Sequence, residues 1–594
     1  MSLPKQSAIL LSLQEPSSSE RNMGQLLDFF GVASRKVLNS DQNALGAPPQ
    51  GIGCGQYSVL SSAVCLVDTL EHYTSTTLLP PLLTSAGSLY IYGFDETEAS
   101  KKLLRLLTGD PQANIRCSHL TQSRISVTSD LPEICGPMSG ISVSGLTLDS
   151  RLVFEVARNC KDCQSLIATS DGDIFLKALR WGLPIFISAG GANLDIETPV
   201  KGNFFDIKDY FCAAVPPVIY LKWAFRDVCW TNSAINASLI VDDPLLKPRY
   251  GCLVYRDVLD LMNQHHFSTT IAFIPWNWRK TNATIAHLFQ QHPDQLSLAI
   301  HGCDHTSHEF GTQSISVLND KIKTAKRRMD VHRQRTSVPY APIMVFPQGV
   351  FSPESAQVLK FNNFTAAVNT EVTPCGGLAN TTVSELWNTA IMQYFDFPIF
   401  SRRYITHGLE NFAFDALLGK PCLIVAHHDS FRDQSRDLTT FLAGINGLKC
   451  SLSWRSLGDT LQRSFRSRDN GDGTTSVQMF SHAIIVENST SAPHTFLIAK
   501  KECNPAGVRA VIHDQSPLDW TYDGGWLQFQ VYVPPKAATH VRVEYADIFG
   551  DHLPANSLSY KAKAGLRRWL SEVRDNYGYR TDFLYRLRTK RWHL

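Results

Sequence analysis

The sequence has almost no net charge, since 56 Lys and Arg residues stand against 54 Asp and Glu residues and leave a formal charge of +2 at pH 7. This balance argues against a nucleic-acid-binding protein, which needs a strongly basic surface. Charged residues make up 19% of the chain and hydrophobic residues 43%, a composition that excludes disordered and fibrous proteins. At 594 residues the chain is several times longer than a typical domain, so we expect at least two domains.

Long apolar runs are also missing, and we expect no secretion signal. Residues 1–20 carry one Lys and a short apolar run interrupted by Ser, with no small-residue cleavage pattern after it. The longest apolar stretches, such as "LIVA" near residue 425, are far too short to cross a membrane. We therefore expect a cytoplasmic protein.

The fourteen Cys residues lack regular spacing. One close pair, Cys160 and Cys163, forms a C-x-x-C motif, but a zinc site of this kind needs a second such pair. We interpret the cysteines as reduced, mostly buried thiols, which fits a cytoplasmic location.

Residues 1–230 are predicted to form an open-sheet α/β domain. Strand-like and helical segments alternate between about residues 86 and 225. The strand-like segments are "SLYIYGF", "QSLIATS" and "PIFISAGG", and the helical ones are "ETEASKKLLRLLTG" and "GDIFLKALRWG". No dinucleotide-binding glycine motif follows these strands, so this domain shows no function of its own.

Residues 235–465 repeat the alternation with short apolar strands and long helical crossovers. The strand-like segments are "STTIAFIP", "LSLAIHG", "APIMVFPQG", "FTAAVNT" and "PCLIVAHHD". Short apolar strands with long crossovers predict a parallel sheet, which we expect to close into a distorted (β/α) barrel.

The last two segments differ in style from the rest. Residues 475–560 hold alternating apolar and polar residues with turns between them, which predicts an antiparallel β-sandwich. Residues 561–594 carry ten Lys or Arg against three acids. Aromatic side chains are interleaved with these charges: Trp569, Phe583, Tyr585 and Trp592. Such a basic, aromatic tail suits a helix that lies on an anionic membrane surface or a packed terminal helix.

Polar residues follow the ends of several strands in the predicted barrel. Each comes directly after an apolar run: Asp242, Asp243, His301, Gln348, His427 and His428. Barrels of this kind build their sites at the carboxyl edge of the strands. We therefore expect these side chains to share one site.

The segment "HGCDHTSHEFG" holds a His-x-x-x-His pair, His301 and His305. Catalytic zinc takes two such imidazoles with a carboxylate and leaves a position for water. Asp242 or Asp243 could supply the carboxylate, because Pro244 ends the strand and lets both acids serve one site. Adjacent carboxylates repel each other, so the simplest arrangement makes one a metal ligand and the other a base. An acidic helix cap is the structural alternative for this pair.

The motif "LIVDD", followed about sixty residues later by "HGCDH", resembles the first two motifs of the polysaccharide deacetylase family, carbohydrate esterase family four and its relatives. The resemblance covers roughly residues 235–465 and implies a barrel of that type. It further implies that Asp242 is the catalytic base. In that family, the second acid and the two histidines bind a divalent metal, with zinc the expected ion, and here these residues are Asp243, His301 and His305.

The segment "VFPQG" resembles the family's Arg-x-Pro-Tyr-Gly loop, whose backbone N–H helps to stabilise an oxyanion. Pro347 and Gly349 match, and Gln348 takes the aromatic position. Val345 stands where the family has the arginine that orients the base. Three arginines elsewhere are candidate replacements: Arg402, Arg403 and Arg432. The family's Asp-Trp motif has no counterpart.

The segment "CLIVAHHDSF" resembles the strand that ends in the family's general-acid histidine. Following the apolar run selects His427, whereas matching a His-Asp pair selects His428, and we favour His427. The implied activity is hydrolysis of an N-acetyl group on an amino sugar in a polysaccharide, glycolipid or sugar precursor.

Two other functions stay open. A carbohydrate-binding protein whose deacetylase domain has decayed would account for the missing arginine. A metal-dependent hydrolase of another amide or of a phosphoester would use His308 or Asp304 as an extra ligand. Bound metal separates the decayed protein from the two enzymes, and acetate release separates the enzymes from each other.

Overall fold

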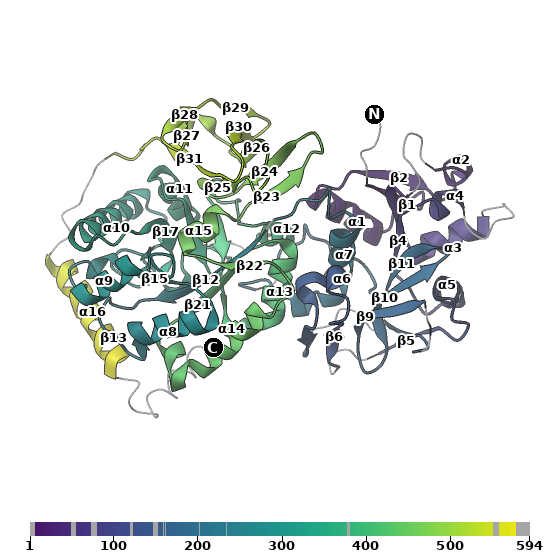
Figure 1. Cartoon of the computed structure of the whole chain (residues 1–594), viewed down its shortest axis with the longest axis horizontal. Helices are drawn as coiled ribbons and strands as arrows, with labels where there is room; N and C mark the ends of the chain where they lie inside the picture. Colours follow the sequence, from purple (N-terminus) through teal and green to yellow (C-terminus); the bar gives the residue numbers. More distant parts are fainter. Residues whose placement is uncertain are drawn as a thin grey trace.

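The computed structural model describes most of the chain: residues 6–48, 55–72, 80–118, 123–146, 152–158, 160, 162–200, 202–232, 234–376, 380–550 and 558–577. An 11-stranded sheet, a nine-stranded sheet and two sheets of five and four strands make up its main layers. Figure 1 shows the N-terminal sheet at one end of the molecule, the nine-stranded sheet at the other, and the two smaller sheets above the latter. The prediction of a multidomain α/β protein is confirmed, whereas the exact domain limits stay predictions.

The N-terminal sheet is parallel in one half and antiparallel in the other. The parallel half comprises β2 (Ser34–Leu38), β1 (Ser7–Ser12), β3 (Tyr57–Ser62), β4 (Ser88–Tyr92) and β11 (Leu183–Ser188). The antiparallel half adds β10 (Asp173–Arg180), β9 (Cys163–Ala168), β6 (Ile125–Val127) and β7 (Ser142–Val143). Beside this path, β8 (Leu152–Glu155) pairs with β10 and with β5 (Asn114–Cys117). Helix α5 (Glu98–Thr108) forms as predicted and ends at Gly109, whose φ of 74° permits the left-handed cap.

The segment "GDIFLKALRWG" is the strand β10, so its prediction as a helix was wrong. β10 pairs with β9 on one side and β11 on the other, and a short apolar run adopts the conformation that this pairing requires. Trp181 and Gly182 have φ values of 53° and 74° and connect β10 to β11 as a two-residue hairpin. The "WG" dipeptide is therefore the turn of a hairpin and not the end of a helix.

The nine-stranded sheet forms a nearly closed parallel barrel. Its main path runs β19 (Ile399–Ser401), β18 (Ala366–Asn369), β17 (Ala341–Val345), β16 (Leu296–His301), β15 (Thr269–Phe273), β12 (Ile235–Asp242), β21 (Cys422–Ala426) and β20 (Arg403–Tyr404). β22 (Leu452–Trp454) pairs with β12 beside this path. All residues of β12 are buried, as expected for a parallel strand covered on both faces. The predicted barrel is therefore confirmed.

Helices surround the barrel and join it to the N-terminal part. Those that follow its strands are α8 (Tyr255–His265), α9 (Ala283–Gln291), α10 (Ile315–Thr336), α11 (Pro353–Phe361), α13 (Leu409–Leu418) and α14 (Arg436–Asn446). α7 (Phe211–Ala224) is apolar on all sides, contacts β11 and α13, and so packs between the sheet and the barrel. One hydrophobic core consequently extends from the N-terminal sheet into the barrel.

The C-terminal sheets form the predicted sandwich. One contains β23 (Arg466–Asp469), β24 (Thr474–Met479), β26 (His494–Lys501), β30 (Trp526–Val533) and β29 (Thr521–Asp523). The other contains β25 (Ala483–Glu487), β31 (Ala538–Tyr545), β27 (Val508–His513) and β28 (Ser516–Leu518). One pair departs from the antiparallel prediction: β24 and β26 are parallel, because the chain crosses to the other sheet as β25 before it returns.

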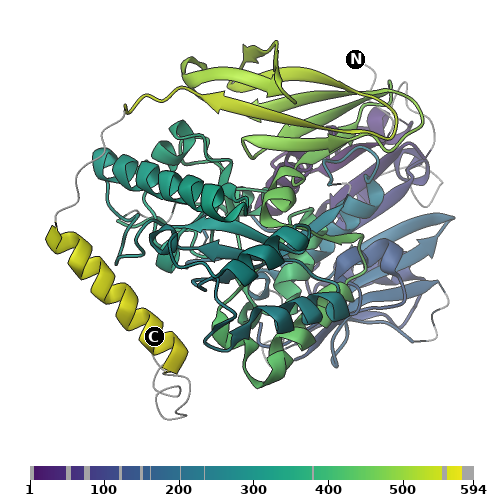
Figure 2. The ribbon, with the colours of Figure 1, turned by 60° about the vertical axis from the view of Figure 1, so that its left-hand side comes forward.

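The basic tail forms one helix in its described part, α16 (Leu558–Tyr577), and the aromatic residues Phe583, Tyr585 and Trp592 lie outside the described residues. α16 crosses the carboxyl edge of the barrel (Figure 2, yellow). It contacts the loops after β16, β15, β12 and β21 through four pairs: Tyr560–Asp304, Glu572–Lys280, Asp575–Tyr250 and Asp575–His428. Within the described residues, no helix is both long and apolar enough to span a membrane.

Candidate metal and catalytic site

The two adjacent aspartates lie where β12 ends. Asp242 is the last residue of the strand, and Asp243 has a φ of 80°, which is rare for a residue other than Gly. Both carboxylates lie near His301, so the break in the strand lets them reach one site. The next helix, α8, begins only at Tyr255, so this pair does not cap a helix.

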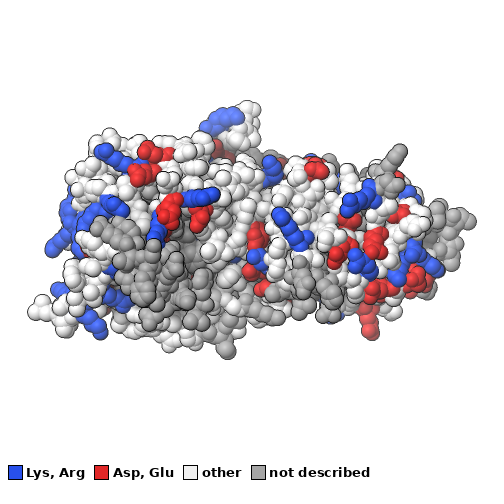
Figure 3. All heavy atoms as spheres, turned by 90° about the horizontal axis from the view of Figure 1, so that it is seen from below, with Lys and Arg blue, Asp and Glu red and all other residues white. Residues whose placement is uncertain are grey.

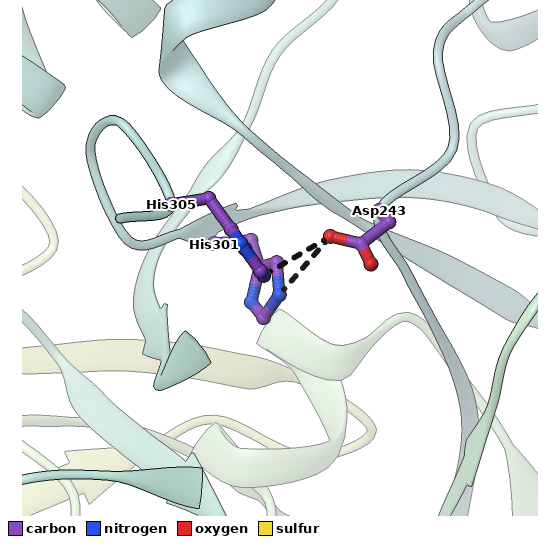
Figure 4. Close-up of side chains that lie close together, drawn as sticks. All are labelled: Asp243, His301 and His305. Carbon is purple, nitrogen blue, oxygen red and sulfur yellow. Dashed lines mark ion pairs between the residues drawn. The ribbon is translucent and has the colours of Figure 1, made fainter. Parts of the chain in front are cut away.

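Asp243, His301 and His305 bring one ligand atom each within 4.8 Å of one another. Asp243 Oδ1 lies 3.2 Å from His305 Nε2 and 3.6 Å from His301 Nε2 (Figure 4). The same oxygen is buried and accepts no hydrogen bond from the residues that the structure describes. A buried acceptor without a partner is costly, and a divalent cation between the three atoms would satisfy it. The donor set of two imidazoles and one carboxylate therefore fits a catalytic zinc-type site.

The two imidazoles are prepared to act as ligands. His301 Nδ1 lies 2.9 Å from the carbonyl oxygen of Val345 and donates to it, which leaves the lone pair on Nε2, the atom that faces Asp243. Burial lowers the pKa of His301 and lowers that of His305 to about 4, against the opposing effect of Asp243. Both rings are therefore neutral near pH 7, as metal binding requires.

Glu309 shapes the loop that carries His305, and the sequence analysis missed it. Its buried carboxylate accepts hydrogen bonds from the backbone N–H groups of Cys303, Asp304 and His305 at 2.9–3.1 Å. Lys321 balances its charge at 3.1 Å. An acid four residues after a ligand, in a loop with little regular structure, was the available signal for this anchor.

Asp304 and His308 stay outside the group formed by Asp243, His301 and His305, the candidate metal cluster. Asp304 forms a second buried acidic group with Cys303 and Glu309, but its carboxylate pairs with Arg328 at 2.5 Å and accepts from Tyr560 at 2.6 Å. His308 is exposed, and its backbone N–H donates to Gln348 Oε1 at 3.2 Å. Neither residue extends the ligand set.

We expect the variant His308→Ala to bind metal with the affinity of the unmodified protein, because the imidazole is exposed and removed from the other ligand atoms. Elemental analysis after dialysis against limiting zinc measures this. If His308→Ala loses its metal while His301→Ala keeps it, the ligand set is wrong.

Arg402 takes the place of the missing arginine in space. Its Nη1 and Nη2 each lie 2.7 Å from one carboxylate oxygen of Asp242, a bidentate pair buried on both sides. Burial raises the pKa of Asp242, but the adjacent guanidinium outweighs it and lowers the pKa overall. Of the other candidates, Arg403 pairs with Asp415 at 2.6 Å. Asp242 is thus ionised and held in a fixed orientation near neutral pH.

Gln348 lies beside the ligand loop. It has a φ of 60° within the turn Pro347–Gly349, and its side chain is exposed. Gly302 packs so tightly on this turn that a Cβ atom would lie 2.4 Å from Pro347 Cγ. Because Gly302 follows His301, this close approach brings the turn next to the metal cluster.

The two candidate acids point to different surroundings. The half-buried ring of His427 stacks on Tyr404 and lies close enough to Asp242 and Asp243 to lower their pKa. The Ser430 backbone N–H donates to the His427 carbonyl oxygen at 3.0 Å, and the His427 N–H donates to the Ser430 hydroxyl at 3.4 Å, so this turn fixes the backbone that carries the ring. His428 instead lies against α16.

The ion pair of His428 with Asp575, at 3.7 Å, ties α16 to the barrel. Burial lowers the pKa of His428, but the Asp575 carboxylate outweighs it and raises the pKa to about 9. Burial raises the pKa of Asp575, but His428 and Arg574 outweigh it and lower it to about 2. The contribution of His428 is complete below its ordinary pKa of 6.5 and is lost as the pH rises through about 9. That of Asp575 is complete above 3.8 and is lost as the pH falls through about 2.

We therefore expect α16 to be held most firmly between about pH 4 and 6.5 and to open at least about tenfold more often at pH 9.5 than at pH 6. Hydrogen-exchange protection factors of residues 558–577, corrected for the intrinsic rate at each pH, measure the opening. Asp575→Asn serves as the control, because it removes the alkaline loss. Equal protection at both pH values in the unmodified protein would contradict the role of this pair.

The chain was compared with family models, curated proteins and solved structures. No family model matches the chain, and no curated protein does. The chain is similar to the solved structure of Agd3, a novel carbohydrate deacetylase, with 10% identity, 91% of this chain and 99% of that chain covered, and a TM-score of 0.47.

Two further solved structures are similar over a smaller part of the chain. One is the Xyl-CE4 domain of a multidomain xylanase from the hindgut metagenome of Trinervitermes trinervoides, with 13% identity, 39% of this chain and 91% of that chain covered, and a TM-score of 0.23. The other is a family 4 carbohydrate esterase from Streptomyces lividans in complex with acetate, with 14% identity, 38% and 93% covered, and a TM-score of 0.23. At these identities and TM-scores the likenesses assign no activity to this chain.

Proposed function

We propose that the chain is a metal-dependent carbohydrate deacetylase that removes N-acetyl groups from an amino sugar in a polysaccharide, glycolipid or sugar precursor. The observation that carries the proposal is the cluster of Asp243, His301 and His305 next to a second, ionised carboxylate that Arg402 orients. This combination of an open ligand set and a separate base is what hydrolysis of an amide by activated water requires.

Asp243, His301 and His305 are the residues that would hold the cation, with zinc as the expected ion. A divalent cation bound there acts as a Lewis acid on a carbonyl oxygen and lowers the pKa of water. Asp242 lies next to that position and, being ionised, can accept the proton of an attacking water. Arg402 keeps its carboxylate from rotating away.

Two further groups have roles on the substrate side. We assign the backbone N–H of Gln348, in the turn next to the ligand loop, to donate to a developing oxyanion. His427 is the group we assign to protonate the departing amine, because its half-buried ring lies near both carboxylates. His428 is engaged with α16, which argues against it as the acid.

The test is acetate release from a panel of N-acetylated oligosaccharides and glycolipid precursors. The proposal expects release that a chelator abolishes and added zinc restores. Release from no substrate, by protein that has bound zinc, would favour a metal-dependent hydrolase of another amide or of a phosphoester. A protein that binds no zinc and releases no acetate would be a decayed carbohydrate-binding protein. The bidentate Arg402–Asp242 pair speaks against decay, because it supplies the orientation that the absence of an arginine at Val345 had put in doubt.

We also propose that α16 contacts an anionic membrane surface. Its buried residues include Arg568 and Asp575, whereas apolar side chains three, four or eight positions apart are exposed: Leu558, Leu566, Trp569, Leu570 and Tyr577. Basic residues lie on the same helix: Lys561, Lys563, Arg567 and Arg574. In Figure 3 the left-hand end, where α16 lies in Figure 1, is mainly basic, whereas the right-hand end carries both signs of charge. The cytoplasmic location stays a prediction.

We expect the double variant Leu566→Ser, Leu570→Ser to bind anionic vesicles at least about tenfold more weakly, because both side chains are more than half exposed and stand on the outward face. Co-sedimentation with vesicles at low salt measures this, and acetate release from a soluble substrate should not change. Leu179→Ser, which alters a Leu of similar exposure on β10, is the matched control. If the unmodified protein ignores such vesicles, α16 is a packing element only.

A further inference from the structure

Arg568 is the one basic residue of α16 that the helix directs into the barrel mouth. Its side chain is only 3% exposed, and its Nε is buried without a partner. In the part of the chain that the structure describes, its guanidinium makes no hydrogen bond or ion pair. A guanidinium has five N–H donors, and a buried donor without a partner is costly. The Nε–H of Arg568 is therefore available to a ligand at this place.

The surroundings of Arg568 locate that ligand. Arg568 lies on α16 between Tyr560, which donates to Asp304 beside the ligand His305, and Asp575, which accepts from Tyr250 in the loop after β12. It is consequently a neighbour of the metal cluster, on the side that α16 covers. The contacts of Tyr560 with Asp304 and of Asp575 with Tyr250 fix the helix on both sides of Arg568, so its position is set by the fold and not by the side chain alone.

We propose that Arg568 binds a carboxylate in the mouth of the barrel, beside Asp243, His301 and His305. A planar guanidinium matches a planar carboxylate with two parallel hydrogen bonds. A monoanion is favoured over a phosphate dianion because the carboxylates of Asp242, Asp243 and Asp575 lie in the same region. The inference deepens the proposed function and rests on it for the identity of the carboxylate.

Two molecules could bring this carboxylate to Arg568. One is acetate, the product of the proposed reaction, which is released at the metal cluster. The other is an acidic substituent of the substrate, such as a uronic acid next to the N-acetylated sugar. A hollow of about 350 Å³ lies beside α16, and its charged lining residues are Lys247, Arg249 and Glu572. The two sources share one chemistry and differ in the measurement that reveals them.

The test compares Arg568→Met, Arg568→Lys and the matched control Arg567→Met, which removes a charge from the same helix at a partly exposed position. Calorimetry of acetate binding to the zinc-loaded proteins gives the first readout. KM and kcat on a neutral N-acetylated oligosaccharide and on one that contains a uronic acid give the second. Hydrogen exchange of residues 558–577 shows whether α16 is still in place.

We expect Arg568→Met to lower the affinity for the carboxylate ligand about 10- to 100-fold, which is the usual loss for a hydrogen bond to a charged group. Arg567→Met should leave this affinity unchanged. A loss of acetate affinity identifies the product as the ligand. A rise in KM for the acidic substrate alone identifies a substrate carboxylate. Where Arg568→Met releases α16, Arg568→Lys decides, because it keeps the charge and loses the planar fork: weakened binding supports the proposal, and unchanged binding overturns it.

Unchanged acetate affinity and unchanged KM for both substrates in Arg568→Met would overturn the carboxylate site. Failure of the proposed function gives a different result. A chain that releases acetate from no substrate, yet loses acetate affinity in Arg568→Met, retains the carboxylate site without the deacetylase.

Discussion

Asp243→Ala and His305→Ala are each expected to lose bound zinc and, with it, acetate release. Each variant removes one of the three ligand atoms that lie together in the described part of the chain. Loss of a residue that merely supports a ligand weakens metal binding by about 10- to 100-fold, so loss of a ligand itself should exceed about a hundredfold. Titration of metal-free protein with zinc against a competing chelator measures the affinity.

His308→Ala is the control for these variants, because it removes an imidazole from the same loop at an exposed position. Thermal unfolding of the metal-free proteins separates loss of a ligand from loss of the fold. If Asp243→Ala binds zinc as tightly as the unmodified protein, the carboxylate ligand has been assigned to the wrong residue.

Asp242→Asn is expected to keep its zinc and lose about 10²- to 10⁴-fold in kcat, which is the usual contribution of a general base. Asn is nearly the same size as Asp and can still contact Arg402, but it cannot accept a proton from water. The measurement is steady-state acetate release at saturating zinc, together with the metal content of the same sample.

Asp415→Asn is the matched control for this variant. Asp415 is also a buried carboxylate paired to an arginine, Arg403, so the variant disturbs a similar ion pair away from the metal cluster. We expect it to destabilise the fold without a comparable loss of kcat. An Asp242→Asn protein that has lost its zinc, beside an Asp243→Ala protein that has kept it, would reverse the roles of the two aspartates.

The sequence predicts the barrel and the ligand set through local patterns. Apolar strands that end at or just before Asp242, His301 and His427 bring these residues to one edge of the barrel, because parallel strands align their carboxyl ends. The spacing of His301 and His305 and the strand-ending Pro244 add the remaining geometry. These features are readable because they depend on neighbours within a few residues.

Contacts between distant segments are not readable in the same way. Arg402 was one of three candidates, and only the closing of the barrel between β19 and β20 brings it to Asp242, 160 residues earlier in the chain. The same holds for β10, whose conformation follows from its pairing with β9 and β11. His428 is adjacent to the acid in sequence and is set apart only by Asp575 on α16.

The C-terminal helix α16 also makes contacts that its own sequence does not predict. Its charge and aromatic content predict a surface helix, and the exposed side chains Leu566, Trp569 and Leu570 agree with that. Its opposite face, with Arg568 and Asp575 buried against the barrel, follows from a fold-back of the chain that no local pattern encodes.

The most direct test of the central claim is anomalous scattering at the zinc edge from crystals of the zinc-loaded protein. The account predicts one strong peak at about 2.0–2.2 Å from His301 Nε2, His305 Nε2 and an oxygen of Asp243, with an open position towards Asp242. A peak at Cys160 and Cys163 or at Cys303, Asp304 and Glu309, with none at the predicted position, would contradict it.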